Sequence, residues 1–203
     1  MRLKQIMFVG LCLVMSISFA MAAEQKHDKK HDKQMDKQAM MEEWKRLGTP
    51  GEPHKVLASL AGSWTTKSKE WMEPGKPPME STGTAEFKTL LDGRFLQQEL
   101  TSEMMGQAYS GIGTTGYDNL RKKYLVAWID SMGTGIFMME GTGSADGKTM
   151  TLKGSHEEPG GGSMSHRAIW KIIDDNTQTF EMYGTHKGGE EMKGMEITYT
   201  RKQ

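Results

Sequence analysis

From residue 62 to the C-terminus, apolar and polar residues alternate in short segments. In one such segment Met150, Leu152 and Gly154 share one phase, and the intervening residues are polar. Turn-forming pairs such as Asp92-Gly93 and Asp146-Gly147 separate the segments. Alternation with period two, interrupted by such turns, is typical of an antiparallel β meander. The pattern predicts about ten strands, beginning near residues 63, 82, 94, 107, 122, 135, 148, 164, 178 and 193.

Ten sequential strands without a crossover helix would leave two unpaired edges, and closure into a barrel removes both. We therefore expect an all-β fold: a ten-stranded antiparallel up-and-down barrel over residues 62–203, preceded by one or two short helices within residues 41–61. Apolar residues at helical spacing predict one helix from about Ala39 to Leu47 and another from Pro53 to Leu60.

Residues 1–22 have the pattern of a secretory signal peptide. A basic start precedes an apolar run from Ile6 to Ala20, and Ala20-Met21-Ala22 has the small-x-small pattern of a cleavage site. The run is shorter than the roughly 20 apolar residues that span a bilayer. We therefore predict a periplasmic or secreted mature chain without stable membrane insertion. Residues 23–40 are polar and of low complexity, which predicts a flexible tether.

Removal of this segment limits the chemistry of the mature chain. Cys12 is the only cysteine, so neither a disulfide nor a thiol would remain. The mature chain would carry 24 basic and 26 acidic residues, a net charge of −2 that gives no reason to expect nucleic acid as a partner. No Gly-x-Ser-x-Gly or His-Glu-x-x-His motif is present, and the carboxylates show no convergence, so the sequence does not support an enzymatic function.

Two resemblances bear on the fold. Gly62-Ser63-Trp64, directly after a short helix, resembles the Gly-x-Trp signature of calycin barrels, which implies that Arg201 on the last strand covers Trp64. Over residues 52–201 the chain is similar to the bacterial domain-of-unknown-function 1579 family. That resemblance implies a barrel of fatty-acid-binding-protein or nitrobindin-like shape, and it brings no activity and no catalytic residues. The segments that carry it are 52–64, 91–95, 116–119, 128–134 and 195–201.

The alternation in the last four strands predicts which side chains face the interior, and three histidines fall in the inward phase. Hairpins centred on Gly161 and Asn176 would pair residue 156 with 166 and residue 166 with 186. Directly paired side chains lie about 5 Å apart, close enough to share one ion or one ligand group. The candidate ligand-contacting residues are His156, His166, His186, Tyr199, Arg201, Trp170, Phe180 and Met182.

Three hypotheses remain open. In the first, the lumen holds a small apolar or amphiphilic molecule, with space left by small inward residues such as Gly83, Ala85, Gly111, Gly113 and Gly154. In the second, His156, His166 and His186 bind a metal or haem, and the many methionines add soft donors suited to cuprous ion. In the third, the barrel is solidly filled and has a structural role. The sequence identifies no cofactor.

Overall fold

The computed structural model describes residues 36–203, which divide into two units between Thr49 and Pro50. The described part of the first unit contains a helix that extends over residues 36–47, so residues before the predicted start at Ala39 are already helical. The predicted signal peptide and the tether up to residue 35 lie outside the described residues. Within the described part of the chain, no helix is long and apolar enough to cross a membrane.

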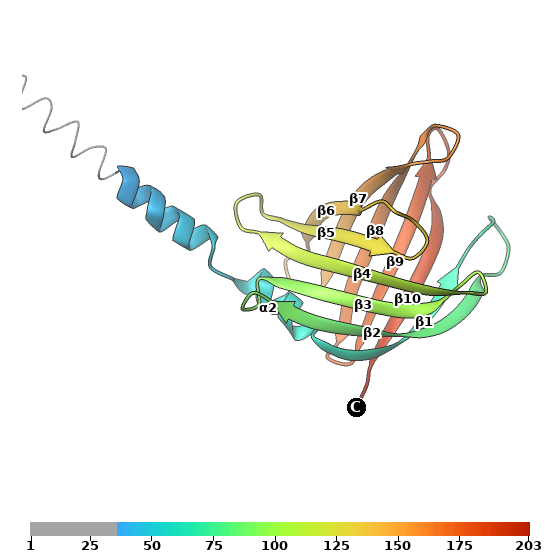
Figure 1. Ribbon diagram of the computed structural model, residues 1–203, viewed down its shortest axis with the longest axis horizontal. Coiled ribbons are helices and arrows are strands. Elements are labelled where there is room, and N and C mark those ends of the chain that lie inside the picture. Colours follow the sequence, from blue (N-terminus) through green and yellow to red (C-terminus); the bar gives the residue numbers. More distant parts are fainter. Residues whose placement is uncertain (1–35) are drawn as a thin grey trace, which may run out of the picture. The chain divides into compact units, whose positions relative to one another are not determined.

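The second unit consists of helix α2 (Glu52–Ser59) and ten strands that close into one antiparallel barrel, each paired with its sequence neighbours and β1 paired with β10 (Figure 1). This confirms the predicted fold class, and every strand begins within three residues of its predicted start. The strands are β1 (Gly62–Glu70), β2 (Met79–Leu90), β3 (Phe95–Met104), β4 (Gln107–Asp118), β5 (Lys123–Asp130), β6 (Phe137–Gly143), β7 (Thr149–Glu157), β8 (Ser163–Asp174), β9 (Thr177–His186) and β10 (Met192–Arg201).

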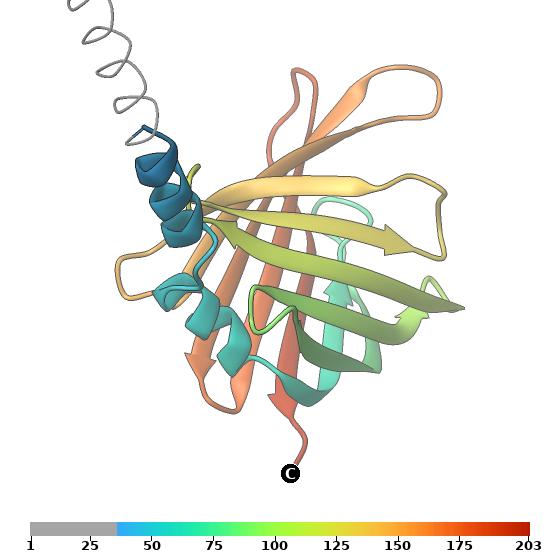
Figure 2. The same ribbon diagram turned by 60° about the vertical axis from the view of Figure 1, so that its left-hand side comes forward.

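Because successive strands run in opposite directions, their connections alternate between the two ends of the barrel. Helix α2 packs against β3 and β4 at the end where even-numbered strands finish (Figure 2). We call this the closed end. The connections after odd-numbered strands form the opposite, open end, and they span residues 71–78, 105–106, 131–136, 158–162 and 187–191.

Large apolar side chains fill the closed end. Leu57 and Leu60 from the α2 region meet Trp64 and Phe87 from the first two strands, and all four are at most 2% exposed. Burial of each such side chain contributes roughly 1.5–3 kcal/mol. The indole Nε1 of Trp64 also donates to the carbonyl of Leu60 at 3.1 Å, which ties the helix to the barrel.

Arg201 completes this end of the molecule. Its guanidinium lies 4.2 Å from the centre of the Trp64 ring and donates to the carbonyls of Ser59, Ala61 and Asp175 at 2.7–2.8 Å. The last carbonyls of a helix have no partner within the helix. Arg201 therefore satisfies the carbonyl of Ser59, the last residue of α2, and that of Ala61 just after it. This is the arrangement that the calycin resemblance implies for Trp64 and Arg201. The donors of Arg201 are directed to backbone at the closed end, and Arg201 is not among the residues that line the cavity in the open half of the barrel.

Candidate functional site

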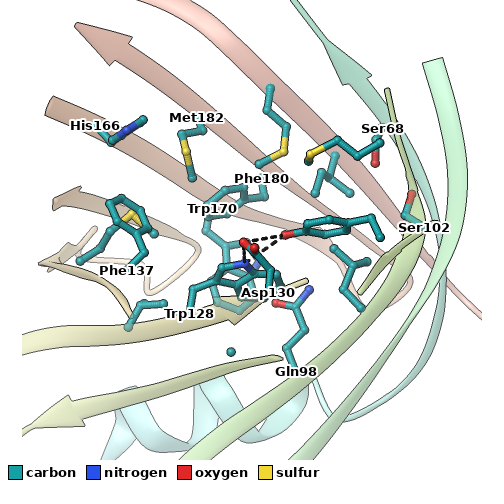
Figure 3. Close-up of a pocket in the computed structure, with 18 of the residues that line it drawn as sticks. Ser68, Gln98, Ser102, Trp128, Asp130, Phe137, His166, Trp170, Phe180 and Met182 are labelled. Atoms are coloured by element: carbon teal, nitrogen blue, oxygen red, sulfur yellow. Dashed lines mark hydrogen bonds between the residues drawn. The ribbon is translucent and has the colours of Figure 1, made fainter. Parts of the chain in front are cut away.

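The open half of the barrel encloses a cavity of about 480 Å³ (Figure 3). Small-molecule sites in proteins typically measure 300–1,000 Å³ and have mainly apolar walls. Six of the eight predicted contact residues lie in this wall, joined by others such as Phe137; the six are His156, His166, Trp170, Phe180, Met182 and Tyr199. The hypothesis of a solidly filled barrel was therefore wrong, because the large side chains fill only the closed half.

Hydrogen-bonded side chains form the floor of the cavity. The hydroxyl of Tyr199 accepts from Nε2 of Gln98 at 3.1 Å, and Nε1 of Trp170 donates to Oε1 of the fully buried Gln178 at 2.6 Å. Burial raises the pKa of Tyr199 to about 12, so its hydroxyl is neutral at ordinary pH. The hydroxyl of Tyr199 and Oε1 of Gln178 are thus already paired and bear no charge, whereas the buried Nε2 of Gln178 has no hydrogen-bond partner among the described residues.

A polar cluster of Tyr109, Trp128 and Asp130 lies in the wall above this floor. Oδ2 of Asp130 accepts from Nε1 of Trp128 at 3.1 Å and from the hydroxyl of Tyr109 at 3.3 Å (Figure 3). Its other oxygen accepts from the backbone N–H of Met132 at 2.9 Å. Burial, together with the neighbouring carboxylate, raises the pKa of Tyr109. The three side chains thus hold a carboxylate in a fixed position in the cavity wall.

Two glycines position the indole of this cluster. A Cβ at Gly111 would lie 2.2 Å from Cζ2 of Trp128, and one at Gly113 would lie 2.8 Å from its Cε3. The indole therefore lies directly on the β4 backbone, which leaves its other face toward the cavity that it lines. These glycines accommodate an aromatic ring, whereas the sequence had suggested that they leave empty space.

Glu70, at the end of β1, is a second carboxylate in the wall. Only 9% of the residue is exposed, and burial raises the pKa of its carboxyl group above the ordinary value for glutamate. Within residues 36–203 it forms no ion pair, and Asp130 forms none.

The predicted register of the β7–β8 hairpin was wrong by two residues. His156 lies opposite Met164, and His166 lies opposite Gly154. The connection over residues 158–162 contains three consecutive glycines with positive φ, which permit a turn centred on residue 160 instead of 161. Because the shift is even, both histidines keep their inward phase.

The β8–β9 register was also wrong by two residues. His166 lies opposite Gly184, and His186 lies opposite Met164. A two-residue turn replaces the expected three-residue loop, and an irregularity between Ile172 and Asp174 shifts the pairing by one further residue. The two changes together restore the inward phase of His186 but remove it from direct pairing with His166.

His156 and His166 nevertheless meet, because diagonal neighbours on adjacent strands remain within reach of long side chains. Their rings stack with centroids 5.0 Å apart, and Nε2 of His166 shares a hydrogen bond of 2.9 Å with Nδ1 of His156. Phe137 packs edge-on against His166 at 5.2 Å. Burial, and next the nearby His156, lowers the pKa of His166, which favours a neutral imidazole in the wall.

His186 lies apart from this pair. Its Nδ1 is 3.1 Å from Oε2 of Glu158, and its side chain borders a second hollow of about 720 Å³ at the open end, which shares His166, Met182 and Met195 with the cavity. Among residues 36–203, no three His, Cys, Asp or Glu side chains are grouped closely enough to hold a metal ion. The three-histidine metal site is therefore not formed, and the residues present do not fit that centre.

Sequence reasoning missed the residues that give the cavity its polar character. Trp128 and Asp130 are two residues apart on β5 and so share a face, a signal that the sequence contains. Their contact with Tyr109 depends on the β4–β5 pairing, which places Gly113 opposite Trp128 and Gly111 opposite Asp130. Glu70 was not recognised because it ends a strand in which the other inward residues are neutral.

Comparison with known proteins supports the barrel. The chain is similar in structure to Rv2717c from M. tuberculosis, with a TM-score of 0.58 and 16% identity over 76% of this chain and 100% of that chain. It is also similar to the S-type phycobiliprotein lyase CPES from Guillardia theta, with a TM-score of 0.53 and 9% identity over 73% of this chain and 92% of that chain. At these identities the likeness shows the fold alone.

Curated protein sequences contain no match to the chain. A family model described as "Protein of unknown function (DUF1579)" matches residues 49–201, the range that contains α2 and all ten strands. The chain therefore belongs to the DUF1579 family.

Proposed function

We propose that this protein is an exported binding protein that holds a small, mostly apolar molecule in the open half of its barrel. The observation that carries the proposal is the cavity of about 480 Å³ among Phe137, Trp170, Phe180 and Met182. Empty apolar volume in a protein interior costs stability, because its lining atoms lose dispersion contacts. A ligand of matching size restores those contacts.

The methionines of the wall suit this function. Met104, Met139, Met182 and Met195 all line the cavity. Their unbranched side chains adjust to ligands of different outline, which favours a site that accepts a class of molecules. The fold supports the proposal by analogy, since a related barrel is a phycobiliprotein lyase.

Export is the second part of the proposal, and it rests on the signal-peptide pattern of residues 1–22. The test is intact-mass analysis of the protein after expression of the full chain in a bacterial host, with periplasm and cytoplasm separated. A mature species that begins at Ala23 in the periplasmic fraction is the expected result. A full-length chain that stays in the cytoplasm would contradict export and leave the binding proposal intact.

Native mass spectrometry of the mature protein tests the binding proposal. We expect an adduct of a few hundred daltons that disappears on denaturation, and we expect extraction with organic solvent to recover it. The matched control is a Val126→Trp variant, which places a large side chain in the cavity wall. An adduct retained by that variant would contradict binding in the cavity. A metal-sized or haem-sized adduct would favour coordination instead.

A further inference from the structure

The charges of the ten strands are distributed unequally between the two faces of the barrel wall. Directly paired residues on neighbouring strands share a face, so the register fixes the phase of every strand position. Trp64 pairs with Ala85 and Ala85 with Leu100, and the same inward phase continues around the barrel. All seven lysines of the strands lie in the outward phase: Lys67, Lys69, Lys88, Lys123, Lys153, Lys171 and Lys193.

The two strand arginines do not reach the cavity either. Arg167 is in the outward phase and pairs with Glu191. Arg201 is in the inward phase but lies over Trp64 at the closed end, with its donors bound to backbone carbonyls. Within residues 36–203, no lysine or arginine therefore lines the cavity.

The inward phase does contain two carboxylates in the cavity wall, Glu70 on β1 and Asp130 on β5. Of the remaining ionisable groups of the wall, His156 and His166 are hydrogen-bonded to each other, and Glu103 is in the outward phase of β3 at the rim. The ionised carboxylates of the wall therefore have no cation beside them in the cavity lining. An organic anion would meet two carboxylates without ion-pair partners and no cation, and this arrangement disfavours a fatty acid.

The surroundings of Asp130 suit a positively charged group. The indole of Trp128 rests on β4 with one face and lines the cavity with the other, beside the carboxylate that its Nε1 holds. The face of an indole attracts ammonium groups, most strongly where water is excluded. A carboxylate and an aromatic face at one point form a site for an organic cation.

We propose that the cavity selects hydrophobic organic cations, namely amines or quaternary ammonium compounds, and that Asp130 and Trp128 hold their charged group. This inference rests on the proposed function of the cavity as a ligand site. The apolar body of the ligand lies among Phe137, Phe180 and Met182, and Glu70 adds a second negative charge to the wall.

Three matched probes separate charge selection from hydrophobic binding. Each carries a naphthalene ring on a four-carbon chain, which ends in a trimethylammonium group, an uncharged tert-butyl group of the same shape, or a carboxylate. Isothermal titration calorimetry of the mature protein with each probe gives three dissociation constants. We expect the trimethylammonium probe to bind at least tenfold more tightly than the tert-butyl probe, and the carboxylate probe to bind most weakly.

Charge-neutralising variants assign the preference to residues. Asp130→Asn keeps one acceptor oxygen for Tyr109 and Trp128, and it loses the bond from the backbone N–H of Met132. We expect it to lower the ratio of cation to neutral affinity at least threefold and to leave the affinity for the tert-butyl probe unchanged. Glu70→Gln should lower the same ratio by a smaller factor. Glu80→Gln is the matched control, because it removes the same charge from an exposed position in the outward phase of β2 and should change nothing.

The possible outcomes distinguish the two proposals. Equal affinity for all three probes, or tightest binding of the carboxylate, would overturn the charge inference and support the cavity as a ligand site. A cation preference that Asp130→Asn leaves unchanged would overturn the assignment to the Asp130 cluster. Failure of all three probes to bind would contradict the proposed function together with this inference.

Discussion

Gly111→Ala is the substitution whose consequence follows most directly from the structure. The added methyl group would lie 2.2 Å from Cζ2 of Trp128, whereas non-bonded carbons approach to about 3.5 Å. The strand backbone is fixed by pairing on both sides, so the indole has to move away by roughly 1 Å or more. Its Nε1 contacts with Asp130 and Tyr109, both 3.1 Å, then exceed hydrogen-bonding distance.

The cost can be estimated from these parts. Overpacking of a core position costs about 1–3 kcal/mol, and loss of the hydrogen bond that the single Nε1–H shares between Asp130 and Tyr109 adds about 1 kcal/mol. We therefore expect the free energy of unfolding of Gly111→Ala to fall by about 3 kcal/mol. For a domain of this size, that corresponds to a decrease in Tm of about 6–12 °C. The displaced ring also enters the cavity, so ligand affinity should fall as well.

Urea unfolding followed by tryptophan fluorescence and circular dichroism measures this effect. Gly135→Ala is the matched control, because a Cβ there meets no atom within 4 Å, and it should change stability by less than about 0.5 kcal/mol. In a Trp128→Leu background the clash is gone, so Gly111→Ala should cost at least about 1 kcal/mol less than in the parent. An equal cost in both backgrounds would refute the explanation by indole displacement.

Three further predictions concern both ends of the barrel. Arg201→Ala should lower the free energy of unfolding by about 2–3 kcal/mol in urea titrations, because charged hydrogen bonds to carbonyls are lost. Because burial raises the pKa of Glu70, there is a pH range in which the folded state keeps the carboxyl proton that the unfolded state has released. The contribution of Glu70 to the free energy of unfolding is therefore lost as the pH rises above the ordinary glutamate pKa of about 4.5. Glu70→Gln should therefore be more stable than the parent at pH 7. Its free energy of unfolding in urea should decrease less between pH 5 and pH 7 than that of the parent, and an unchanged pH dependence would contradict this. Val126→Trp should weaken binding of the naphthalene probes at least tenfold in calorimetry and keep the unfolding midpoint near that of the parent, because the cavity accommodates the ring.

The sequence predicted the barrel and its inward phases because both depend on local signals. Alternation with period two fixes the face of Met150 and Leu152 without knowledge of the neighbouring strand, and both are buried. Turns rich in Gly and Asp mark the strand ends. The same signals do not fix register, which depends on turn conformation. The positive φ of Gly160 and its neighbours and the irregularity after Ile172 each shifted a pairing that the sequence alone could not place.

The candidate site was less predictable because it depends on contacts across the closed barrel. Trp128 reads in the sequence as one more apolar strand residue, and its function in the wall follows from the two glycines opposite it. Asp130 reads as an isolated carboxylate until Tyr109 is placed beside it. For Arg201 the phase alone was also insufficient, since its inward phase suggested a ligand contact, whereas its guanidinium lies over Trp64 at the closed end.

The barrel therefore separates stability from binding along its axis. The closed end contains Trp64, Phe87 and Arg201 and has connections of two to five residues, whereas connections at the open end reach eight residues. Long connections over a rigid scaffold are where binding properties vary most easily among related proteins. This separation predicts that Arg201→Ala reduces stability and leaves the ratio of probe affinities unchanged, and that Asp130→Asn lowers this ratio with a smaller loss of stability. A single variant at either end that changed both quantities in proportion would indicate that the two halves are energetically coupled.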